Sequence, residues 1–134
     1  MSMKKKVILA AALLALLWTF YLMASVALNH LSVSPRVAGG HLHSFSDPLR
    51  FTYGVEALMM IFQFFFLIKI FQRHGVWSNT TTLLAKIFLV LAIMSIVVNA
   101  VSRSSAERWN AISALAIAYA FYELADLRIK PRRK

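Results

Sequence analysis

The residues of this sequence best suited to chemistry are a few polar side chains inside long apolar runs. Glu56 and Gln63 lie seven positions apart, so a helix places them on one face. Asn99 and Asn110 belong to two later runs, at positions that predict a depth similar to that of Glu56. An acid at the centre of a bilayer costs about 2.5 to 3.5 kcal/mol and so needs a partner, a route to water or a function. We predict a shared polar site of Glu56, Gln63, Asn99 and Asn110.

Two roles are open for Glu56 within that site. In the structural hypothesis, its carboxylate pairs with Arg103 or Arg108, or accepts hydrogen bonds from asparagine side chains. In the functional hypothesis, it holds a cation or a proton, because acids inside membranes often mark such sites.

A second charged pair is predicted near the other membrane surface. Lys86 lies near the start of the third apolar run, and Glu123 lies near the end of the fourth. Antiparallel packing of these two runs places both residues at a similar depth. We predict a Lys86–Glu123 ion pair with a structural role, and a proton or ion relay is the alternative.

Metal and cofactor chemistry has little support. His41 and His43 form an HxH pair in a loop, and two imidazoles could contribute to an outward-facing metal site, although an unoccupied polar loop is the simpler interpretation. The chain has no cysteine, which excludes disulfides, thiolate ligands and CxxCH haem attachment. No histidine lies inside an apolar run where it could ligate haem, so no cofactor is expected.

Catalytic motifs are equally scarce. The sequence contains no GxSxG, HExxH or phosphate-binding glycine loop. We therefore expect a protein that is not an enzyme.

The elements that must position these residues are four apolar runs. Hydrophobic residues make up 60% of the 134 residues, against roughly 45 to 50% in soluble domains. The runs cover residues 7–28, 51–71, 83–101 and 109–127, followed by a basic tail at 128–134. Each is long enough for a transmembrane helix, although the fourth is the least hydrophobic. The predicted fold is all-α: one transmembrane domain forming an antiparallel four-helix bundle.

The first run has a second interpretation. Lys4, Lys5 and Lys6 precede it, and Ser25-Val26-Ala27 resembles a signal-peptide cleavage site. Its twenty-two uncharged residues exceed the usual apolar stretch of about 7 to 15 residues, which favours a retained helix.

Charge distribution predicts the orientation. Eleven Lys and Arg fall on the side of both termini and the second loop, against four on the other side. Positive loops stay in the cytoplasm, so we predict that both termini are cytoplasmic, in a bacterial inner membrane. Because these charges flank apolar runs and form no basic face, nucleic-acid binding is not expected.

Three functions remain from this pattern. The first is a non-catalytic accessory or structural subunit of a larger membrane complex, with the bilayer and other membrane proteins as partners. Small-xxx-small spacings at Ala114 and Ala118 and at Ala116 and Ala120 suit close helix contacts. The second is a homo-oligomeric transporter or channel for a small solute or ion that uses Glu56. The third is an outward-facing metal sensor that uses His41 and His43.

Overall fold

The computed structural model describes residues 2–73 and 78–127, and its regular structure in these ranges is entirely helical. The elements are α1 (Met3–Ala27), the 3-10 helix η1 (Leu31–Arg36), α2 (Asp47–Gln72), α3 (Asn79–Ala100), the short α4 (Ser105–Arg108) and α5 (Asn110–Leu124). The predicted basic tail at 128–134 lies outside the described residues.

Serine side chains cap four of these helices at their N-termini. Ser2, Ser46, Ser78 and Ser104 each accept a hydrogen bond from the backbone N–H three residues further on. Such a cap satisfies one of the N–H groups that a helix start leaves without a partner. As a result, α1, α2 and α3 each begin about one turn before the predicted apolar run, because polar first turns belong to the helix as well.

Among residues 2–73 and 78–127, three helices are long and apolar enough to cross a membrane, namely α1, α2 and α3. The run predicted at 109–127 forms the shorter α5, whose 15 residues extend about 22 Å. It ends at Leu124, and Asp126 then adopts a positive φ of 49°. The neighbouring α4 is separated from α5 only by Trp109, which has helical backbone angles.

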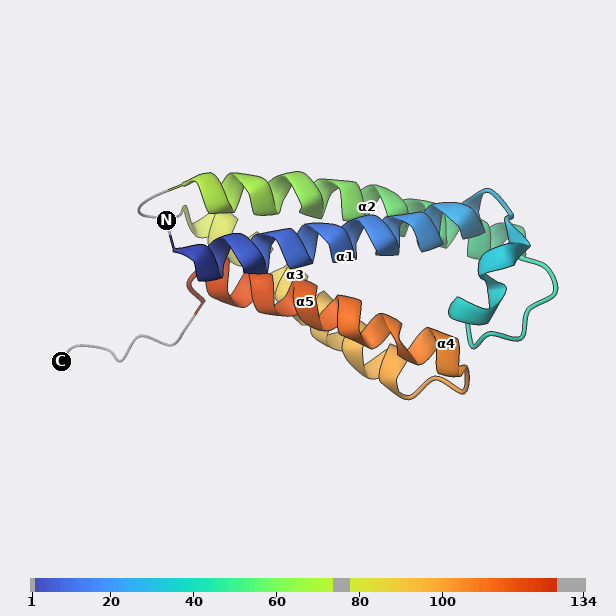
Figure 1. Cartoon of the computed structure of the whole chain (residues 1–134). Helices are drawn as coiled ribbons and strands as arrows, with labels where there is room; N and C mark the ends of the chain where they lie inside the picture. Colours follow the sequence, from blue (N-terminus) through green and yellow to red (C-terminus); the bar gives the residue numbers. More distant parts are fainter. Residues whose placement is uncertain (1, 74–77, 128–134) are drawn as a thin grey trace.

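The long helices lie side by side, with α1 packed against both α2 and α5, and α5 packed against α3 (Figure 1). The start of α1 and the end of α5 lie at one end of the molecule, which we call the terminal end. Helix η1 and the α3–α4 connection lie at the opposite end, which we call the η1 end (Figure 1).

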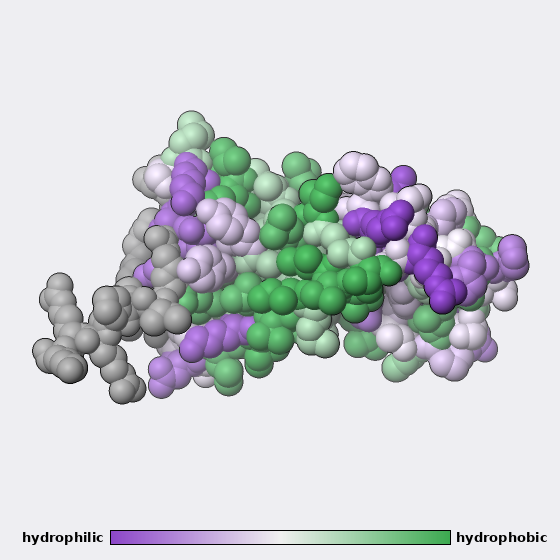
Figure 2. Space-filling view, turned by 90° about the horizontal axis from the view of Figure 1, so that it is seen from below, coloured by the Kyte–Doolittle hydropathy of each residue, from purple (hydrophilic) through white to green (hydrophobic). Residues whose placement is uncertain are grey.

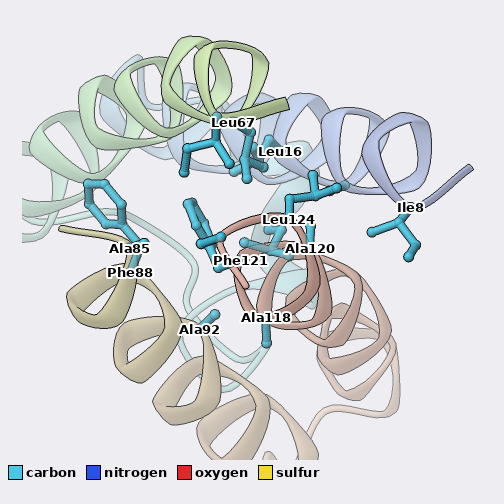
Figure 3. Packing of buried hydrophobic residues seen from close by; sticks show 14 of the residues in the cluster. Ile8, Leu16, Leu67, Ala85, Phe88, Ala92, Ala118, Ala120, Phe121 and Leu124 are labelled. Atoms are coloured by element: carbon cyan, nitrogen blue, oxygen red, sulfur yellow. The ribbon is translucent and has the colours of Figure 1, made fainter. Parts of the chain in front are cut away.

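The larger of two packed cores lies towards the terminal end and is built mainly from aromatic rings, alanines and aliphatic side chains. The ring of Phe88 on α3 lies 5.6 Å from that of Phe66 on α2 and 5.4 Å from that of Phe121 on α5. Leu16 of α1 and Leu67 of α2 point towards Phe121 (Figure 3). Alanines allow the backbones to approach closely around these rings. The buried alanines of this cluster are Ala12, Ala15, Ala85, Ala92, Ala118, Ala120 and Ala125.

Much of the outer surface is apolar. Figure 2 shows a hydrophobic band along the middle of one face, with hydrophilic residues towards both ends. Large side chains such as Leu14, Val97 and Val98 are exposed on this surface. An apolar belt between polar ends is what a bilayer covers, so the surface is compatible with an integral membrane protein.

Candidate binding cavity

A cavity of about 380 Å³ lies among α1, α2, α3 and α5, and it extends to the η1 end. Its lining includes Glu56 and Gln63 of α2, Asn99 of α3 and Asn110 of α5. The structure therefore brings the four polar residues singled out in the sequence to the wall of one cavity.

Helical periodicity explains which residues reach the cavity. On α2 the lining residues follow a spacing of three and four, which keeps them on one face. The same spacing recurs on α3 and α1. These lining residues are Tyr53, Glu56, Met59, Met60 and Gln63 on α2, Leu91, Ala92, Met94, Ser95, Val98 and Asn99 on α3, and Thr19, Leu22 and Met23 on α1.

Towards the terminal end, aromatic rings close the cavity. On α2 the lining ends at Gln63, and Phe66 follows one turn later. On α3 it ends at Leu91, with Phe88 one turn beyond, and on α5 it ends at Ile117, one turn before Phe121. Because Phe66, Phe88 and Phe121 contact one another, they form a floor between the cavity and the terminal end.

At the η1 end the cavity is covered by residues 31–40, which we call the lid. Arg36 and Val37 of the lid line the cavity. The N–H of Gly39 donates to the Glu107 carboxylate at 2.9 Å, and the Asn110 amide donates to the Arg36 carbonyl at 2.8 Å. The Ser104 hydroxyl also donates to the Pro35 carbonyl. Three hydrogen bonds thus attach the lid to α4 and the start of α5.

Glu107 is a site residue that the sequence analysis did not identify. Its side chain is only 8% exposed, it lines the cavity, and its carboxylate accepts hydrogen bonds from Gly39 and Ser102. The signal was the Ser104-x-x-Glu107 spacing, which is typical of a capping box. Ser104 does cap α4, but the carboxylate of Glu107 turns to the lid and to Ser102 instead of to the cap residue.

Glu56 is half-buried on the cavity wall. Within the described residues, its carboxylate has no ion pair or hydrogen bond, and the suggested partners Arg103 and Arg108 are exposed. The amide of Asn99 donates to Ser95 of its own helix, at 2.8 Å to the carbonyl. The amide of Asn110 donates to the lid. The carboxylate is therefore left to face the cavity.

The charges along the wall favour a cation. The lining residues with ionisable acidic or basic side chains in the described part of the chain, apart from Tyr53, are Glu56, Glu107 and Arg36, so full ionisation of the three gives one net negative charge. The guanidinium of Arg36 lies 5.5 Å from the centre of the Trp18 ring, so it is held against that indole at the η1 end. The carboxylate of Glu107 is occupied by two donors, so Glu56 is the acid available to a ligand.

Glu123, one member of the second predicted pair, has a partner on α1. Glu123 forms a salt bridge with Lys4 of α1 at 3.7 Å and accepts a hydrogen bond from the Tyr119 hydroxyl at 3.4 Å. Lys86 is exposed on α3, and its pairing with Glu123 stays a prediction. The close packing of α1 on α5 brings Lys4 to the depth of Glu123.

The candidate metal ligands do not assemble into a site. His41 and His43 are both exposed, and the described residues contain no group of three His, Cys, Asp or Glu side chains that could hold a metal ion. The imidazole of His41 lies against Gly39 of the lid. Two imidazoles alone leave half of a tetrahedral metal shell unfilled.

Comparison with known proteins finds no matching family model, no similar curated protein and no similar solved structure. The function is therefore inferred from the cavity.

Proposed function

We propose that this protein binds a small cationic solute in the cavity and transports it across the membrane. The observation that supports this most directly is the convergence of Glu56, Gln63, Asn99 and Asn110 around one cavity, with the carboxylate of Glu56 left without a protein partner among the described residues. Mostly apolar pockets with a few convergent polar groups are the usual form of small-molecule sites.

The proposed membrane arrangement is a four-helix bundle, with α4 and α5 together making the fourth crossing and both termini in the cytoplasm of a bacterium. The excess of Lys and Arg on the terminal side supports this orientation. In it, the lid and the mouth of the cavity face outward. Met94 and Val98 form an exposed rim on α3, which lipid would cover, so the lid is the boundary towards water.

Changing Glu56→Gln tests the proposal. The amide has nearly the same shape but carries no charge, so cation binding is expected to fall at least about tenfold. The measurement is binding and liposome uptake of three probes, K⁺, tetramethylammonium and phenyltrimethylammonium, by the purified protein.

Glu123→Gln is the matched control, because it makes the same change in a second acid that pairs with Lys4 away from the cavity. It is expected to keep probe affinity within about threefold. If the Glu56 variant binds and transports every probe as the unmodified protein does, the cavity is not a cation site.

The accessory-subunit hypothesis is the second candidate. The exposed apolar surface favours it, because partner helices could cover that surface as well as lipid does. The small residues of α5 do not add to this support, since Ala114, Ala118 and Ala120 are buried inside the chain. Purification in mild detergent separates the two: a stable unrelated polypeptide at fixed stoichiometry favours the subunit, and a homogeneous small oligomer favours transport.

A further inference from the structure

The methionines of this protein gather around the cavity. Within the described residues, every methionine except Met3 lines it, namely Met23 of α1, Met59 and Met60 of α2, and Met94 of α3. Three helices thus contribute thioethers to one space. The polar groups named above account for charge and hydrogen bonding, but they do not explain this second feature of the lining.

Methionine suits a wall that must adapt to its ligand. Its side chain is unbranched and has three rotatable bonds and a polarisable sulfur, so it reshapes around apolar groups and favours aromatic rings. Surfaces rich in methionine accept ligands of differing shape for the same reason. Tyr53, one turn before Glu56, adds an aromatic face to the same wall.

The size of the cavity also limits its occupant. A bare inorganic ion needs several ligands converging within about 3 Å, whereas this space measures about 380 Å³ and is lined largely by apolar side chains. That volume falls in the range of pockets that hold small organic molecules.

We infer that the cation is an organic ammonium with an apolar body, whose charged head meets Glu56 and whose body contacts the methionines. This inference rests on the proposed cation site and adds the apolar half of the ligand. Tolerance of different apolar bodies follows from the same flexible wall.

Two probes that differ only in the apolar body test the inference. Phenyltrimethylammonium carries a phenyl ring on the head that tetramethylammonium presents alone. Isothermal titration of the full chain in lipid nanodiscs is expected to show at least tenfold tighter binding of the phenyl compound, because its ring is removed from water against Met59 and Met60. Titration with empty nanodiscs subtracts partitioning into lipid.

Methionine variants provide the second measurement. The double change Met59→Ala and Met60→Ala is expected to reduce the phenyl preference at least fivefold while tetramethylammonium affinity changes less than twofold. The double change to Leu conserves side-chain volume and is expected to retain most of the preference. Thermal unfolding of each variant shows that it is folded before titration.

Distinct outcomes separate this inference from the proposed function. Equal affinity for the two ammonium probes overturns the inference of an apolar body and leaves the proposed cation site intact. Failure of all cations to bind overturns both the inference and the proposed function. Ag⁺ serves as a third probe, since thioethers select soft metals. Tight Ag⁺ binding that the Leu variant abolishes, without a phenyl preference, overturns the inference in favour of a soft-metal site.

Discussion

Gly40→Ala is expected to detach the lid from α4 and open the cavity at the η1 end. Gly40 has a φ of +78°, a conformation that costs an L-residue roughly 1 to 2 kcal/mol. An added Cβ would also lie 2.6 Å from Cβ of Ser104 and 2.9 Å from the Pro35 carbonyl oxygen, in the place where the lid meets α4. Together these effects are expected to cost the closed lid about 2 to 4 kcal/mol.

A single cysteine can report the opening, because the chain contains none of its own. Gln63 lines the cavity next to its floor and is only 3% exposed, so Gln63→Cys places the reporter deep inside. With Gly40→Ala added, a membrane-impermeant thiol reagent is expected to label this cysteine at least about tenfold faster, since each 1.4 kcal/mol changes an opening equilibrium tenfold.

Gly54→Ala is the matched control. Gly54 lies within α2, and an added Cβ there would meet only Cβ of Ala27 at 3.6 Å, an ordinary contact. This variant is expected to be neutral or more stable by up to about 1 kcal/mol, because alanine favours helix. If Gly40→Ala leaves labelling at the unmodified rate, residues 31–40 do not control access.

The sequence was sufficient to predict which polar residues share a helix face or a depth, but not which residues close the cavity. Glu56 and Gln63 share a face because seven residues make about two helical turns, and this held without knowledge of the packing. Asn99 and Asn110 followed from depth along antiparallel runs. Glu107 could not be found in this way, because its carboxylate meets a backbone N–H from Gly39, 68 residues earlier, and that contact depends on how the lid folds.

Two further differences have similar physical causes. Apolar runs mark the part of a helix that suits the hydrocarbon core, so they miss the polar first turns that Ser2, Ser46 and Ser78 cap. The contact of Glu123 with Lys4 was not predicted, because several lysines lie at one depth and only the three-dimensional packing places Lys4 beside Glu123. The depth of a residue along a helix can be predicted from one sequence, but its neighbours on adjacent helices cannot.

The second large effect is expected from a substitution in the aromatic floor of the cavity. Phe121 is fully buried, and its ring lies 5.4 Å from Phe88 and 6.3 Å from Phe66 (Figure 3). In a bilayer, removing this ring forfeits packing contacts more than transfer from water, because lipid is itself apolar. Phe121→Ala is therefore expected to cost about 2 to 3 kcal/mol, at the low end for a buried phenylalanine. Reversible unfolding in mixed micelles measures it.

The same substitution also tests whether the rings separate the cavity from the terminal end. With Phe121→Ala, the cysteine at position 63 is expected to become reactive to impermeant reagent applied from the terminal side, because the space left by the ring adjoins the wall at Ile117. Phe51→Ala serves as the control, since Phe51 is 75% exposed, and it should alter neither stability by more than about 0.5 kcal/mol nor labelling. If Phe121→Ala leaves stability unchanged and the cysteine at position 63 does not react from the terminal side, other residues close the floor. A loss of stability without new labelling would show that Leu16, Phe66 and Phe88 suffice as a barrier, so that opening the floor requires a movement of whole helices rather than of one ring.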